Sequence, residues 1–112
     1  MIWGGATAAE LHTLRFMAKS PLSGLNVLLL EDDVLLRKRL TGFLEREGAE
    51  VTAVSTVGAA RQALEALSFE AAVIDVNLPD GRGTDLLRDK LFPSTTNVVV
   101  MTAEGGVAGA VE

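Results

Sequence analysis

At 112 residues, the chain is long enough for one domain with a hydrophobic core of its own. Its net charge of −5 argues against direct binding of nucleic acid, because nucleic-acid-binding domains are usually basic. The lack of cysteine excludes disulfides and thiolate metal sites. No apolar run approaches the roughly 18 residues of a membrane span, and the start of the chain does not resemble a signal peptide. We therefore expect an acidic domain of the cytoplasm that binds neither nucleic acid nor membrane.

The first 24 residues differ in pattern from the rest of the chain. Apolar residues stand at helical spacing within residues 6–19, and Ser20-Pro21 then breaks this pattern. We interpret residues 1–24 as an N-terminal appendage that could contain a short helix, and residues 25–112 as the main domain.

From Leu25 onward, the spacing of apolar residues predicts strands that alternate with helices. Short continuous apolar runs predict four strands buried on both faces, over residues 26–31, 50–55, 71–75 and 97–101. Helical periodicity predicts three complete helices and the start of a fourth, over residues 34–47, 57–67, 84–91 and 107–112. This alternation is typical of an α/β fold whose parallel sheet is built from right-handed βαβ crossovers.

The ends of the predicted helices carry suitable capping residues. Asp33 and Thr84 are candidate N-caps of the first and third helices, and Ser55 or Thr56 can cap the second. Gly48 is a candidate stop for the first helix. These residues support the predicted helix limits.

Two further patterns concern the first helix and the segment before the third. The first helix has one apolar face, formed by Leu36, Leu40, Phe43 and Leu44. Residues 77–83 are rich in glycine and turn-forming residues, which predicts a loop in which Asp80 and Gly81 are ordinary turn residues.

Three carboxylates stand where two of the predicted strands end. Glu31 and Asp32 follow the first strand, and Asp75 ends the third. Ligands bind beyond the carboxyl ends of the strands in sheets of this kind. Acidic side chains crowded there repel one another unless a cation is present, and oxygen ligands suit Mg²⁺. The sequence therefore predicts an acidic, magnesium-dependent pocket at this edge of the sheet.

Three segments at the strand ends together resemble the receiver domain of bacterial two-component response regulators. The segments are residues 27–33, 74–81 and 99–103, and the similarity extends over about residues 25–112. The resemblance implies a flavodoxin-like (CheY-like) doubly wound sheet of five parallel strands in the order 2-1-3-4-5. It also implies a signalling domain that catalyses its own phosphorylation and dephosphorylation only.

The resemblance assigns roles to the acidic residues and their neighbours. Asp75 matches the aspartate that accepts a phosphoryl group from a histidine kinase or phosphotransfer protein. Glu31 and Asp32 match the acidic pair that holds Mg²⁺ together with the acceptor. Asn77 matches the position whose backbone carbonyl completes the metal site.

Further positions match residues that sense or tune the phosphoryl group. Thr102 matches the hydroxyl residue that hydrogen-bonds the phosphoryl group and switches the conformation of the domain. Ala103 matches the small residue that leaves room for this group. Asn77 and Glu104 match positions that tune its lifetime.

The resemblance also implies a fifth strand that ends in a lysine, but the sequence stops within the expected fourth helix. The fourth strand, residues 97–101, would then be an open apolar edge, which favours pairing with another chain. We expect one of three arrangements: a longer protein, a partner or second copy on this edge or the fourth-helix face, or residues 6–19 folded over part of the exposed face.

Two other functions fit parts of the pattern. The first is a phosphorylation-independent pseudo-receiver that uses the same fold to interact or dimerise. The second is a small magnesium-dependent phosphatase that forms an aspartyl phosphate. The phosphatase fits less well, because such enzymes usually place the nucleophile after the first strand, whereas Asp75 follows the third.

Overall fold

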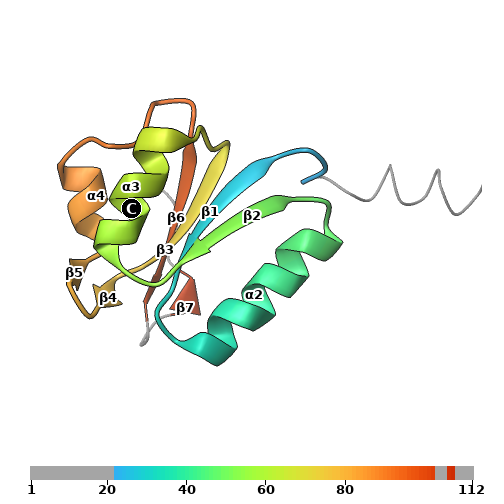
Figure 1. Ribbon diagram of the computed structural model, residues 1–112, viewed down its shortest axis with the longest axis horizontal. Helices are drawn as coiled ribbons and strands as arrows, with labels where there is room; N and C mark the ends of the chain where they lie inside the picture. Colours follow the sequence, from blue (N-terminus) through green and yellow to red (C-terminus); the bar gives the residue numbers. More distant parts are fainter. Residues whose placement is uncertain (1–21, 103–105, 108–112) are drawn as a thin grey trace, which may run out of the picture.

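Apolar runs form the central strands of a parallel sheet in the computed structural model, which describes residues 22–102 and 106–107 (Figure 1). The parallel strands are β1 (Asn26–Leu30), β2 (Glu50–Val54), β3 (Ala71–Asp75) and β6 (Asn97–Thr102). Their order across the sheet is β2-β1-β3-β6, which is the predicted order of the first four strands. The predicted α/β class and doubly wound topology are therefore confirmed.

Helices cover the two faces of this sheet unequally (Figure 1). The helix α2 (Val34–Arg46) joins β1 to β2 and packs on one face against these strands. The helices α3 (Val57–Ala66) and α4 (Thr84–Arg88) lie on the opposite face. In the described part of the chain, no helix combines the length and apolar character needed to cross a membrane.

The main hydrophobic core lies between the sheet and the pair of helices α3 and α4. Strand residues alternate between the two faces, so every second side chain points to this core. The core consists of nine buried aliphatic or aromatic residues, namely Leu28, Leu30, Val57, Ala60, Phe69, Ala72, Ile74, Leu86 and Val98. These contacts fix β1 and β3, the two strands that lead to the predicted acidic pocket.

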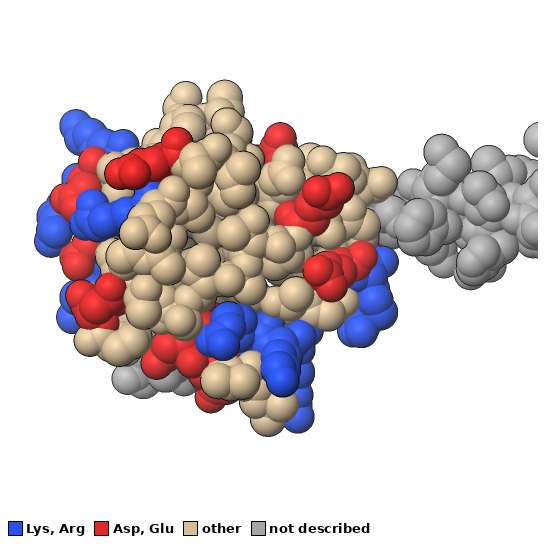
Figure 2. All heavy atoms as spheres, viewed as in Figure 1, with Lys and Arg blue, Asp and Glu red and all other residues tan. Residues whose placement is uncertain are grey.

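The face covered by α2 is less well packed. Val27 and Leu29 of β1 are buried there, but no residue of α2 is buried within the described structure. Leu36 and Phe43 from the predicted apolar face are 41% and 52% exposed. Figure 2 shows basic side chains gathered along α2 beside uncharged ones, and the helix carries Arg37, Lys38, Arg39 and Arg46.

Most of the predicted helix limits are confirmed. Asp33 is the N-cap of α2, since its Oδ1 accepts a hydrogen bond of 2.9 Å from the Leu36 N–H. Thr56, and not Ser55, caps α3 through a bond of 3.0 Å from the Ala59 N–H. Gly48 follows α2 with a φ of +99°, a conformation that favours glycine.

The prediction for the third helix was partly wrong. Gly83 occupies the N-cap position of α4 without a side-chain bond, and Thr84 is the first helical residue. The helix ends at Arg88 instead of residue 91 because Lys90 adopts a left-handed conformation with a φ of 58°. The Leu91 N–H then bonds the Leu86 carbonyl at 3.1 Å, which closes the helix end.

The segment predicted as a loop contains a small hairpin. The strands β4 (Asn77–Leu78) and β5 (Gly81–Arg82) pair antiparallel, and Pro79-Asp80 forms the two-residue turn between them. Sequence reasoning identified the turn but not the strands, because two-residue strands are too short to show alternation.

The strand β7 (Gly106–Val107) corrects the prediction of a helix from Val107 onward. It pairs antiparallel with the end of β6, at Met101 and Thr102, where free backbone groups of the edge strand accept a neighbour. Residues 97–100 have no strand neighbour on this side within the described residues, so the predicted open edge is covered only at its carboxyl end. The predicted helix in residues 6–19 and residues 108–112 lie outside the described residues.

The core predicts that replacing a buried leucine by alanine lowers the free energy of unfolding far more than replacing an exposed one. Leu28 is fully buried, so Leu28→Ala should lower the free energy of unfolding by about 2–5 kcal/mol. Leu35 is 59% exposed, so Leu35→Ala should change it by no more than about 0.5 kcal/mol. Urea unfolding followed by circular dichroism measures both, and equal losses would contradict the described core.

Candidate metal centre

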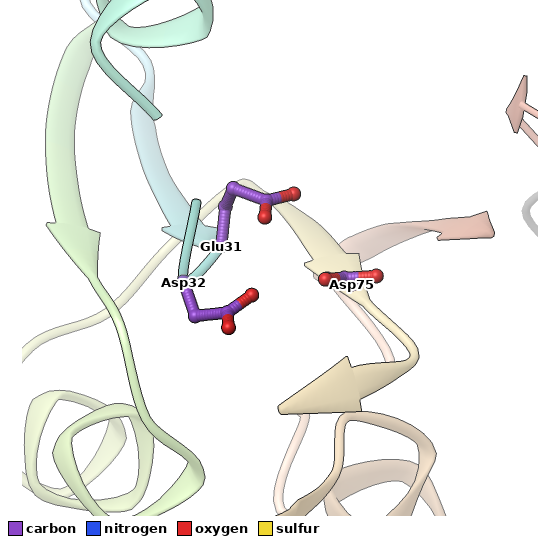
Figure 3. Close-up of side chains that lie close together, drawn as sticks. All are labelled: Glu31, Asp32 and Asp75. Atoms are coloured by element: carbon purple, nitrogen blue, oxygen red, sulfur yellow. The ribbon is translucent and has the colours of Figure 1, made fainter. Parts of the chain in front are cut away.

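The three predicted carboxylates lie together at the carboxyl ends of β1 and β3 (Figure 3). The two strands are parallel neighbours, with Leu30 opposite Ile74, so the residues that follow them meet at one edge of the sheet. One carboxylate oxygen each from Glu31, Asp32 and Asp75 lies within 4.8 Å of the others. The sequence prediction that these side chains converge is confirmed.

Glu31 is the most buried member of the cluster, with 4% of its surface exposed. Its backbone N–H donates to the Val54 carbonyl at 3.0 Å, and its Oε2 accepts a bond of 2.9 Å from the Asp33 N–H. Burial raises the pKa of Glu31 above its ordinary value, and the negative charges of Asp75 and Asp32 raise this pKa further. The bond from the Asp33 N–H opposes this rise without cancelling it. A cation at this site would stabilise the charged form.

The other two carboxylates are more accessible, which suits a hydrated cation. Asp32 is exposed and Asp75 is half-buried. Mg²⁺ usually keeps several waters and binds through one or two carboxylates together with substrate oxygens. The donor set of three hard oxygens, partly open to solvent, therefore fits Mg²⁺.

Arg37 supports the backbone of the acidic pair and was not singled out from the sequence. Its Nη1 donates to the Glu31 carbonyl at 2.9 Å and to the Asp32 carbonyl at 3.3 Å. A helical side chain extends back toward the amino end of its helix, so a basic residue four positions after the N-cap Asp33 can reach the preceding turn. This spacing was the signal available in the sequence.

The segment after Asp75 returns very close to the backbone of this residue. The Gly83 N–H donates to the Val76 carbonyl at 2.9 Å. A Cβ atom at Gly83 would overlap the carbonyl oxygen of Asp75, so only glycine allows this approach. Asn77 lies between them in β4, where it is exposed and opposite Arg82.

The remaining predicted site residues are only partly described. Thr102 ends β6, one residue beyond Met101, the register partner of Asp75. Its backbone therefore lies at the same edge of the sheet as the acidic cluster. The side chain of Thr102, and both Ala103 and Glu104, lie outside the described residues.

Comparison with known proteins identifies the family. The model of the response regulator receiver domain matches residues 27–112. The response regulator protein PmrA of Pseudomonas aeruginosa is 36% identical over 88 residues, which cover 78% of this chain and 40% of PmrA. The chain spans less than half of the length of the curated relatives that it matches.

Solved structures show the same fold. The non-phosphorylated HemR receiver domain from Leptospira biflexa is 30% identical with a TM-score of 0.66, and the match covers 73% of this chain and 67% of that one. A Burkholderia pseudomallei response regulator with a phosphorylated aspartic acid, a calcium ion and citrate is 26% identical with a TM-score of 0.65. That match covers 70% of this chain and 46% of the other. The family model matches most of the length of this chain, and the sheet has the expected strand order. The chain therefore belongs to the response regulator receiver domain family.

Proposed function

We propose that this receiver domain accepts a phosphoryl group on Asp75 from a histidine kinase or phosphotransfer protein. The observation that carries the proposal is the convergence of Asp75 with Glu31 and Asp32 within 4.8 Å at the carboxyl edge of the sheet. The Burkholderia relative, whose structure contains a phosphorylated aspartic acid and a calcium ion, supports the same chemistry here.

The residues proposed to hold Mg²⁺ are Glu31, Asp32 and Asp75, with the backbone carbonyl of Asn77. When bound, the ion would neutralise the carboxylates and the oxygens of the incoming phosphoryl group, which carry most of the charge in the transition state. Without a cation, the acidic cluster would repel a phosphate dianion, so phosphorylation should depend on the metal.

The proposed step is an in-line displacement at phosphorus. A carboxylate oxygen of Asp75 attacks the phosphoryl group of a phosphohistidine, forming an O–P bond as the N–P bond breaks. The electron pair of the broken bond stays on the imidazole nitrogen of the donor. The product is an aspartyl phosphate, which water later hydrolyses to restore the carboxylate.

The residues beyond the cluster are proposed to respond to the phosphoryl group and to set its lifetime. Thr102 would donate a hydrogen bond to the new phosphoryl oxygens and so shift the end of β6. Ala103 would leave room for the group, and the side chains of Asn77 and Glu104 would tune its lifetime. We further propose that the domain contacts the kinase and is located in the cytoplasm. We also propose that it forms a homodimer through the uncovered edge of β6.

Replacement of the acceptor tests the proposal directly. With acetyl phosphate and Mg²⁺, the native chain should take up one phosphoryl group, and Asp75→Asn should take up none because an amide is not a nucleophile. Intact-mass spectrometry measures the uptake. Asp89→Asn is the matched control, because Asp89 lies outside the cluster and pairs with Arg61 at 2.6 Å; it should be phosphorylated like the native chain.

The outcomes distinguish a phosphoacceptor receiver domain from a pseudo-receiver with the same fold. Uptake that survives in Asp75→Asn would place the acceptor elsewhere. No uptake by the native chain would contradict the proposal and favour a phosphorylation-independent pseudo-receiver.

The raised pKa of Glu31 predicts how stability depends on pH and metal. A carboxyl group whose pKa is raised by folding stabilises the fold fully below its unfolded value near 4.5, and this contribution is lost as pH rises through the folded pKa. Without metal at neutral pH, Glu31→Gln should therefore have a higher melting temperature than the native chain, and the difference should shrink as pH falls toward 4.5.

Added Mg²⁺ should reverse the comparison at neutral pH, because the ion stabilises the charged native cluster more than the variant. Differential scanning calorimetry with and without MgCl₂ measures both effects. Glu45→Gln, at an exposed position of α2, is the control and should show neither. A metal effect of equal size in Glu31→Gln and the native chain would remove Glu31 from the proposed ligand set.

A further inference from the structure

The turn of the β4–β5 hairpin is attached to the amino end of α3 by one side chain. The Asp80 Oδ1 accepts a hydrogen bond of 2.8 Å from the Val57 N–H, and its Oδ2 accepts one of 3.0 Å from the Gly58 N–H. Asp80 is separated from these residues by more than 20 positions in the sequence. The carboxylate therefore links two segments that would otherwise be held together only by packing.

The amino end of α3 has N–H groups that an acidic side chain from another segment can satisfy. The first N–H groups of a helix have no partner within the helix, and a negative charge is favourable beside them. The first turn of α3 contains no acidic residue, and the side chain of its N-cap Thr56 accepts only the Ala59 N–H. Asp80 satisfies the Val57 and Gly58 N–H groups, and these two bonds hold its pKa below the ordinary value.

The hairpin that Asp80 anchors is continuous with the acidic cluster. Asn77 begins the hairpin, two residues after Asp75, and its register partner is Arg82. The other end of the hairpin is tied to the start by the bond from the Gly83 N–H to the Val76 carbonyl, directly beside the Asp75 carbonyl. The hairpin is thus attached at the acceptor backbone and at α3, and also at α4, where the Arg82 N–H donates to the Asp85 Oδ2 at 3.2 Å.

We propose that Asp80 is a positioning residue of the metal site: by anchoring the β4–β5 hairpin to α3, its carboxylate sets the position of the Asn77 backbone relative to Asp75. The inference rests on the proposed function, in which the Asn77 carbonyl is a ligand. It assigns to Asp80 a role beyond that of a turn residue or a helix cap. Residues of this kind, which support a ligand without touching the metal, commonly control affinity by about tenfold or more.

The experiment compares two variants that each remove a cap from α3. Asp80→Ala removes the cap and the anchor together, whereas Thr56→Ala removes only a cap. Both should lower the melting temperature. Titration with MgCl₂, followed through backbone amide signals of Asp75 and its neighbours in two-dimensional NMR spectra, should show about tenfold weaker binding for Asp80→Ala. Thr56→Ala should bind like the native chain.

A third variant keeps the test valid if Asp80→Ala does not fold. Asp80→Asn retains one acceptor oxygen and should bind Mg²⁺ with an affinity between those of the native chain and Asp80→Ala. The Asn77 amide signal should also move in both Asp80 variants before any metal is added, and should stay in place in Thr56→Ala.

Each outcome has a distinct meaning. If Asp80→Ala, or Asp80→Asn in its place, binds Mg²⁺ like the native chain, the inference is wrong and the proposed function stands. If Thr56→Ala weakens binding as much as Asp80→Ala, Asp80 acts only as a cap and the inference is again wrong. If the native chain binds no Mg²⁺, the proposed function fails and the inference fails with it.

Discussion

The repulsion among three neighbouring carboxylates is the constraint on which the functional edge of this fold depends. Two unit charges within 4.8 Å of each other repel by about 3.5 kcal/mol or more at an effective dielectric constant near 20. Among the described residues, the ion pairs join arginines 61 and 88 to aspartates 85 and 89, and none neutralises the cluster. Burial of one leucine contributes about 2 kcal/mol, so the repulsion within a single pair is comparable to the burial of one or two of the three leucines of β1.

The backbone contacts around the cluster keep its members in place without neutralising them. Arg37 donates to the carbonyls of Glu31 and Asp32 and leaves their carboxylates free. The Asp33 N–H donates to one oxygen of Glu31, and Gly83 packs directly on the Asp75 carbonyl. The fold thus fixes the positions of the carboxylates through neutral or backbone-directed contacts, and the negative charge remains available to a cation.

The sequence predicted the sheet and the cluster because both follow from local patterns. Apolar runs mark buried strands, and parallel pairing brings residues after two such runs to one edge, so Glu31 and Asp75 could be placed together. Arg37 and Asp80 were missed because their roles depend on side-chain contacts with distant or preceding backbone. The early end of α4 at Arg88 and the strand β7 were missed. The single left-handed residue Lys90 and a two-residue pairing leave no periodic signal in the sequence.

The unequal packing of the two faces indicates which parts of the site are rigid. Glu31 directly follows β1, and Asp75 is the last residue of β3. One face of these two strands packs in the buried core against α3 and α4. The β4–β5 hairpin lies outside this core, and only half-buried Leu78 packs against it. Two of the three carboxylates therefore have positions set by core burial, while the Asn77 backbone depends on a few hydrogen bonds at the ends of its hairpin. Contacts outside a core open at lower free energy than the core itself. The hairpin should therefore be the part of this site that opens most readily.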